Sequence, residues 1–308
     1  MPPLTRARAA AEAPTLLDAL ARAPAAAALV VAALKRAKDR KALRLAHPQL
    51  RDAVCEATRR LTVDLRAAAA ARPPTPRRWP RLEDLTICWP DLAVIEALGS
   101  GTWGRLRNLC LSNQTHGAAS AADAPALAAA LRQMPALRAL HLWRMAIQDA
   151  SALELFCAAA SDIRSLTLNG AALSPGTARA LAATGWRLEE LHLRMNPDLG
   201  AAGVAALLAA PTFAVRRLIL GDSNLDAAAL LALANAPWPL EQLYICSSNF
   251  SAAAAGPALA ALSQHARLRE LDISNCSLHA AGKITEVTGT AAPARAPSNA
   301  RPPAPPAR

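Results

Sequence analysis

Aromatic residues are scarce in this chain of 308 residues, which has six Trp, three Phe and one Tyr. Hydrophobic residues nevertheless make up 53% of it, and 79 residues are Ala. A core of such a protein is built mainly from Leu and Ala, whose compact side chains let helices and strands approach closely. Because disordered chains are marked by low hydrophobicity, the composition excludes disorder of the whole chain.

Long apolar runs and paired cysteines are also missing. The longest apolar run, from Ala25 to Leu34, has ten residues, about half of what a transmembrane helix needs. No two of the six Cys form a CxxC pair, which removes the usual signal for zinc or thioredoxin-like chemistry, and scattered free Cys fit a reducing compartment. Since the phosphate-loop, HExxH and GxSxG motifs are absent as well, we expect no metal, no cofactor, no membrane partner and no enzymatic activity.

The positive charge is confined to the two ends of the chain. Residues 1–81 hold 17 Lys/Arg against 6 Asp/Glu, residues 82–287 hold 14 against 17, and the tail 288–308 has three Arg and no acid. A basic terminus could bind nucleic acid or an anionic surface through counterion release, or it could be a solvated basic helix. We favour the solvated helix, because nucleic-acid motifs with aromatic stacking are absent, and therefore expect no nucleic-acid partner.

One pattern organises the middle of the chain: an apolar residue, two variable residues, Leu, one variable residue and another apolar residue. Successive copies begin 24 to 31 residues apart, with a mean of about 27, which is the range of leucine-rich repeats. The eight copies begin at Leu82, Leu106, Leu137, Ile163, Leu188, Val215, Leu240 and Leu268.

Each repeat predicts one strand and one helix. The LxL part alternates with period two, as a half-buried strand does, so the middle Leu of each copy should lie in one buried row. A further apolar residue, such as Leu92 or Ile147, should close the core after each strand. Ser151, Ser174 and Ser251 are predicted helix starts. The predicted helices are Ala124–Met134, Ala152–Ala160, Pro175–Ala183, Ala201–Ala210, Asp226–Asn235 and Ala252–Gln264.

Residues 82–279 resemble leucine-rich-repeat proteins of the ribonuclease-inhibitor-like or cysteine-containing type. Those families carry Asn or Cys at the ninth repeat position, which Asn196 and Cys276 match. The resemblance implies an α/β solenoid with a curved parallel sheet on the concave side and helices on the convex side, and a non-catalytic role in protein binding. The other ninth residues do not match: Pro90, Gln114, Met145, Ala171, Ser223 and Ser248.

The N-terminal segment 1–66 reads as helical, except that Arg60–Leu65 resembles an atypical first strand. The stretch Asp39–Val54 (DRKALRLAHPQLRDAV) resembles the second half of an F-box, with matches at Leu43, Leu45, Leu50 and Val54. That resemblance implies binding of the Skp1 adaptor, so that the chain would be a substrate receptor of a Skp1–cullin ubiquitin ligase. The alternative, which we favour, is a helical cap over the first repeat.

The remaining segments complete the expected organisation. Residues 67–81 form a Pro/Arg-rich linker, residues 82–287 the solenoid, and the Pro/Ala/Arg-rich residues 288–308 a disordered tail. The composition is typical of a GC-rich genome. By resemblance to intracellular leucine-rich-repeat proteins of green algae, it implies a place in the cytoplasm or the ciliary axoneme.

Variable strand positions give the candidate binding residues, because they face the concave surface. Trp, Tyr and Arg are enriched in interface hot spots, although a Trp can also pack on a neighbour or a loop. His141 and His192 lie two strands apart, about 10 Å, too far to share a metal ion. The predicted partner-binding residues are Trp89, Trp143, Arg144, His192, Arg194 and Tyr244.

Overall fold

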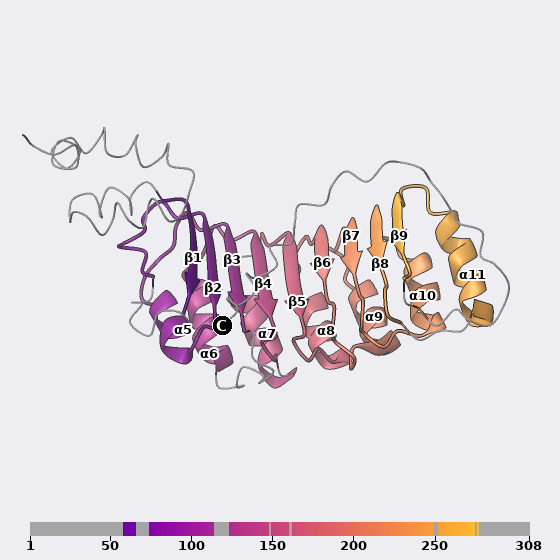
Figure 1. Cartoon of the computed structure of the whole chain (residues 1–308), viewed down its shortest axis with the longest axis horizontal. Coiled ribbons are helices and arrows are strands. Elements are labelled where there is room, and N and C mark those ends of the chain that lie inside the picture. The colour runs from indigo at the N-terminus through magenta and orange to yellow at the C-terminus, as the bar shows by residue number, and fades with distance from the viewer. Residues whose placement is uncertain are drawn as a thin grey trace, which may run out of the picture.

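The computed structural model describes residues 58–65, 74–113, 123–147, 149–159, 162–248, 252–274 and 276. Strands and helices alternate through these ranges, and the strands form one sheet in the order β1 to β9. Figure 1 shows the sheet as one layer and the helices as a second layer along one of its faces. The strands are β1 Arg60–Asp64, β2 Asp84–Cys88, β3 Asn108–Ser112, β4 Ala139–Trp143, β5 Ser165–Asn169, β6 Glu190–His192, β7 Arg217–Ile219, β8 Gln242–Tyr244 and β9 Glu270–Asp272.

Every neighbouring pair of strands is parallel and shares one register. Leu61 of β1 pairs with Leu85 of β2, and Leu85 pairs with Leu109 of β3. The same alignment continues to Leu271 of β9. The predicted repeats therefore stack with the middle Leu of each strand in an unbroken row, and Arg60–Asp64 is a strand, as its alternation indicated.

The helices fall where the repeat pattern predicts them, and each contacts the next along the stack. Ser174 caps α8, accepting hydrogen bonds from the amides of Gly176 and Thr177. Ser151 was predicted as a helix start but lies inside α7, and Ser251 lies outside the described residues. The helices are α5 Leu92–Leu98, α6 Asp123–Arg132, α7 Asp149–Ala158, α8 Pro175–Ala182, α9 Gly200–Leu208, α10 Ala227–Ala234 and α11 Ala252–Ser263.

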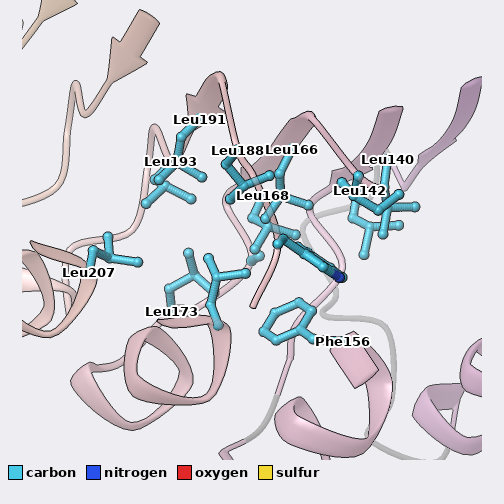
Figure 2. Close-up of a cluster of buried hydrophobic side chains, with 14 of the residues drawn as sticks. Leu140, Leu142, Phe156, Leu166, Leu168, Leu173, Leu188, Leu191, Leu193 and Leu207 are labelled. Atoms are coloured by element: carbon cyan, nitrogen blue, oxygen red, sulfur yellow. The ribbon is translucent and has the colours of Figure 1, made fainter. Parts of the chain in front are cut away.

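The core lies between the sheet and the helices. Figure 2 shows leucines of neighbouring strands and Phe156 of α7 converging there. The middle leucines of β2 to β8 are at most 1% exposed, but Leu271 of β9 is 37% exposed. The prediction of a buried Leu271 is therefore wrong. β9 is the edge strand of the described sheet, so no further described strand covers its outer side.

The residue that closes the core after a strand is buried, as predicted, in four of the five repeats in which it is described; Phe250 and Leu278 lie outside the described residues. Ile147, Leu173, Leu199 and Leu225 are buried, with at most 4% of their surface exposed. Leu92 is 42% exposed, against the prediction. It is the first residue of α5, and the helix turns Val94 and Ile95 toward the core instead.

Besides the middle leucines and the closing residues, the core contains a row of large apolar side chains from the loops that lead into the strands. Trp186 meets Phe156 edge-on at 5.8 Å between ring centroids, and Trp238 packs against Phe213 at 6.3 Å. Most of the scarce aromatic residues are therefore used to fill the core. The buried members of this row are Trp79, Trp103, Met134, Trp186, Phe213 and Trp238.

Several sequence predictions lie outside the described residues. They are the helical segment before β1, with Leu43, Leu45, Leu50 and Val54, residues 67–73 of the predicted linker, and the C-terminal tail. Within the described ranges, no helix has the length and apolar character needed to cross a membrane.

Candidate interaction surface on the open face of the sheet

The face of the sheet that carries none of the described helices, called here the open face, is built from the variable strand positions. In a strand, successive side chains point to opposite faces. Because the fourth and sixth repeat positions fill the core, the third, fifth and seventh point outward. The fifth position forms a row across the sheet: Thr86, Cys110, His141, Thr167, His192, Ile219, Tyr244 and Asp272.

Two histidines flank a threonine at the centre of this row. His141 Nδ1 lies 2.7 Å from Thr167 Oγ1. On the other side of Thr167, His192 is its register partner in the neighbouring strand β6. Burial lowers the pKa of His141, and burial together with the nearby Arg217 cation lowers the pKa of His192 to about 4. Both imidazoles are therefore neutral at physiological pH. The described residues contain no group of three or more His, Cys, Asp or Glu arranged to hold a metal ion.

The β7–β9 part of the open face is charged and internally paired. The Arg217 guanidinium lies 5.7 Å from the centroid of the Tyr244 ring, a cation–π distance. Burial and a hydrogen bond to Glu270 raise the pKa of Tyr244 to about 12. Glu270 also accepts a hydrogen bond of 2.9 Å from the Gln242 amide. Tyr244 is thus a neutral, positioned phenol at working pH.

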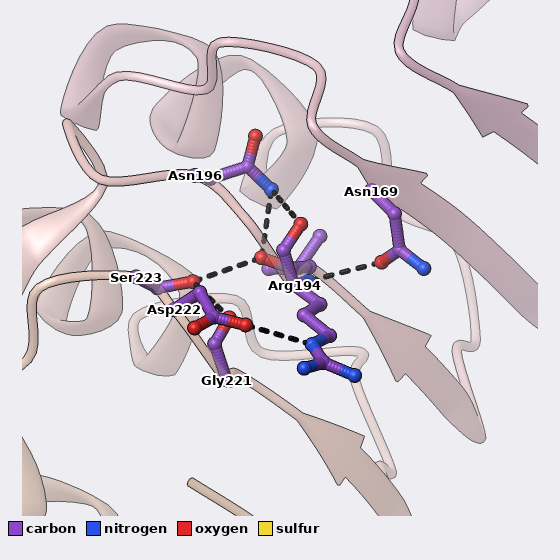
Figure 3. A network of polar contacts seen from close by, with 7 residues as sticks. Asn169, Arg194, Asn196, Gly221, Asp222 and Ser223 are labelled. Carbon is purple, nitrogen blue, oxygen red and sulfur yellow. Dashed lines mark hydrogen bonds and ion pairs between the residues drawn. The ribbon is translucent and has the colours of Figure 1, made fainter. Parts of the chain in front are cut away.

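A second set of polar contacts fixes the strand ends of β5 to β7 (Figure 3). The Arg194 side chain pairs with the Asp222 carboxylate at 2.8 Å, while its backbone N–H donates to Asn169 Oδ1 at 3.0 Å. Gly221 lies between these side chains and Cys246, since a Cβ on Gly221 would lie 2.5 Å from Cys246 Sγ. The Arg194 side chain, half exposed, is held in place on the open face.

The Asn196 side chain holds the backbone of the same region in place from the buried side. It is fully buried. Its carbonyl oxygen accepts from the amides of Ala171 and Leu173 at 2.9 and 3.2 Å, and its NH2 group donates to the carbonyls of Leu168 and Leu193. One side chain therefore ties two successive repeats together.

The ninth repeat position also binds backbone carbonyls in the sixth and eighth repeats. The Ser223 hydroxyl donates to the Leu193 carbonyl at 3.0 Å, and the Cys276 thiol donates to the Ile245 carbonyl at 3.1 Å. Met145 and Ala171 fill the same position in earlier repeats without a polar side chain, and both are buried. The Asn or Cys pattern thus identifies Asn196 and Cys276 but misses Ser223, which makes a similar hydrogen bond to a backbone carbonyl.

The eighth repeat position lies at the strand end and adopts a left-handed backbone in six of the repeats. Only Gly170 takes this conformation without steric cost, since other residues lose about 1–2 kcal/mol in it. Sequence reasoning missed this feature, because its usual signal is Gly or Asn. The eighth residues with positive φ are Trp89, Arg144, Gly170, Met195, Asp222 and Ser247.

Large apolar side chains lie exposed around β5. Trp143, which ends β4, is 39% exposed, and Met195, which follows β6, is 44% exposed. Between them, Asn169 is 7% exposed, and a Cβ on Gly170 would contact Arg144 and Met195. The end of β5 is thus flanked by two exposed apolar side chains.

The six predicted partner-binding residues all lie on the open face or at its strand-end rim, but they do not form one compact patch. Trp143, Arg144, His192 and Arg194 belong to β4, β6 and their ends, on either side of β5. Trp89 follows β2 and Tyr244 lies in β8. Those two strands are six strand spacings apart, about 29 Å. Met195, which the prediction left out, belongs with the central group.

Comparisons with known proteins do not place the chain in a family. No family model matches the sequence, and no curated protein matches it. The functional interpretation therefore rests on the repeat, its register and the side chains of the open face.

Proposed function

We propose that the chain is a leucine-rich-repeat protein, of the ribonuclease-inhibitor-like or cysteine-containing type, that binds a partner protein on its open face. The repeat length, the shared register and the bridging role of Asn196 support the family assignment. The open face corresponds to the concave side of such solenoids.

The observation that carries the binding proposal is the exposure of Trp143. Its ring is 39% exposed on β4, while Trp79, Trp103, Trp186 and Trp238 are at most 6% exposed in the core. The sheet does not need a Trp on the open face, because neighbouring strands form with Cys, Ser, Thr or Asn at their fifth and seventh positions. Exposed Trp, with Arg beside it, is the typical composition of an interface hot spot.

The ionisation of the open face supports binding without catalysis. Burial raises the pKa of the Cys110 thiol to about 11, so that it stays protonated and a poor nucleophile. His192 has a pKa of about 4, well below the range in which a general base works best at neutral pH.

Affinity purification from the source organism with three matched baits tests the proposal. The baits are the unaltered chain, Trp143→Ala and Leu153→Ala; Leu153 lies on α7 and is 49% exposed. We expect at least one protein to be recovered with the unaltered chain and with Leu153→Ala, and to be lost with Trp143→Ala. Identical recoveries with all three baits would contradict binding at the open face.

The F-box-like spacing of Leu43, Leu45, Leu50 and Val54 supports a second proposal, recruitment of Skp1 by the N-terminal segment. Replacement of Leu43 and Leu45 by Asp should abolish capture of purified Skp1, because charged side chains cannot enter an apolar interface. An unaltered chain that fails to bind Skp1 at micromolar concentration would leave the cap interpretation.

A further inference from the structure

The edge of the sheet where the strands begin carries a row of charged side chains, one from the second position of each repeat. Backbone hydrogen bonds place these residues next to each other. The amide of Asn108 donates to the Glu83 carbonyl at 3.0 Å, and the amide of Ala139 donates to the Arg107 carbonyl at 2.9 Å. Neighbours in the row are therefore about one strand spacing apart.

In the third, fourth and sixth repeats the arginine of this row has an acidic partner, whereas the exposed Arg269 of the eighth repeat forms no ion pair with a described residue. Arg138 pairs with Asp162. Arg164 pairs with Glu189 at 2.5 Å, and Arg216 pairs with Glu241 at 2.8 Å. This edge of the fold therefore readily accommodates an acidic side chain beside an arginine.

The first two repeats differ, because five arginines gather there. We call Arg77, Arg78, Arg81, Arg105 and Arg107 the arginine edge; all but Arg78 are exposed, and Arg78 is half-buried. None of the five forms a side-chain hydrogen bond or ion pair with another described residue.

The loops that carry the arginine edge touch each other. A Cβ on Gly101 would lie 3.4 Å from Pro76, the residue before Arg77. The nearby carboxylates are already engaged: Glu83 lies 3.8 Å from Arg59, and Asp84 pairs with Arg60 at 2.6 Å. The arginine edge thus gathers five arginines on two loops that touch each other, with no acidic partner among the described residues.

The neighbouring chain segments outside the described residues contain no more acidic than basic residues. Residues 1–57 contain ten Lys/Arg and five Asp/Glu, residues 66–73 contain two Arg and no acid, and residues 114–122 contain neither sign of charge. Each of these segments is basic or neutral. None of them has an excess of acidic residues, which favours an anion supplied by another molecule as the partner of the arginine edge.

We propose that the arginine edge binds an acidic polypeptide segment of a partner protein. A polypeptide fits better than a nucleic acid, because the aromatic rings of these loops are unavailable for base stacking: Trp79 is 6% exposed and Trp103 is 3% exposed. The bordering carboxylates Glu83 and Asp84 would repel a continuous phosphate backbone, whereas a peptide can place neutral residues opposite them. This surface is separate from the open face and does not depend on the function proposed for it.

The experiment uses the full chain and a fluorescein-labelled octaglutamate peptide as the probe, with binding followed by anisotropy. The test variant carries Arg77→Gln, Arg78→Gln, Arg105→Gln and Arg107→Gln. The matched control carries Arg132→Gln, Arg138→Gln, Arg164→Gln and Arg216→Gln, which removes the same charge from arginines that have acidic partners. Thermal unfolding of both variants establishes that they are folded, and the single variant Arg105→Glu replaces the test variant if that one unfolds.

We expect the dissociation constant for the peptide to rise about tenfold or more in the test variant and less than about threefold in the control, because only the test variant removes a local cluster. Equal losses in the two variants would overturn the proposal, since net charge alone would then explain binding. A short mixed-sequence DNA duplex that binds more tightly than the peptide, and that also loses affinity in the test variant, would overturn it in favour of a nucleic-acid surface.

Discussion

The two sides of each strand obey different rules. On the core side, the middle position is Leu in every strand, and from β2 to β8 it is at most 1% exposed. On the open side, the fifth position changes from one strand to the next, from Thr86 to His141 to Tyr244. The core side specifies the fold and carries no information about partners. The open side is free of that constraint, and its residues are therefore available for recognition.

The largest expected effect is on the core side. Leu191→Ala should lower the free energy of unfolding by about 2–5 kcal/mol, because it removes a fully buried side chain and leaves a cavity. Leu153→Ala, on an exposed helix position, should cost less than about 0.5 kcal/mol. Denaturant unfolding of both variants checks the difference, and similar costs would contradict the assignment of the two sides.

A second large effect is expected at the ninth position. Asn196→Ala should cost about 3 kcal/mol, because it leaves buried amides of Ala171 and Leu173 without an acceptor. Ser223→Ala should cost about 1 kcal/mol, because it removes one hydroxyl donor and orphans no amide. Equal unfolding midpoints for the two variants would show that the amide does not bridge the repeats.

The buried histidines predict a pH dependence. His192 has a folded pKa of about 4, below its usual 6.5, under the influence of burial and of Arg217, with Glu190 acting in the opposite direction and His141 adding to the lowering. The unfolded chain therefore binds more protons, and the free energy of unfolding should fall as pH drops from about 6.5 toward 4, by up to about 1.4 kcal/mol per pH unit for this group. His192→Gln should reduce that slope, as measured by unfolding across this pH window, and an unchanged slope would contradict the burial of His192.

The smallest effect concerns the exposed ion pair of Arg194 and Asp222. Surface pairs contribute about 0.2–1 kcal/mol, so a double-mutant cycle with Arg194→Gln and Asp222→Asn should give a coupling energy below about 1 kcal/mol. A coupling above about 2 kcal/mol would mean that the open face contributes to the fold as strongly as the core does.

Much of the fold could be predicted from the sequence because the repeat imposes a physical period. The buried leucines alternate with period two, and helix α8 Pro175–Ala182 matches the predicted helix Pro175–Ala183 to within one residue. What the period could not predict is the burial of single residues, since Leu92 and Leu271 satisfy the pattern and are nevertheless exposed. Burial depends on whether a neighbouring element covers the position.

The candidate site was harder to predict for a related reason. The pattern places Trp143 on the open face, but it does not tell which of the other Trp residues fill the core. Trp186 and Trp238 each lie two residues before the first residue of a repeat, outside the six-residue pattern from which burial was predicted. Met195 stands at the eighth repeat position, one of the variable positions expected on the concave surface, but it was left out of the predicted patch; it is 44% exposed and has a positive φ of 63°.

The most direct test of the central claim is a paired measurement on Trp143→Ala, once the partner recovered with the unaltered chain is in hand. Because the ring is exposed, the variant should keep its unfolding midpoint while its affinity for that partner falls by about 2 kcal/mol or more, the hot-spot range. Unchanged affinity together with a large loss of stability would show that Trp143 packs as a structural residue. The open face would then not be the binding surface.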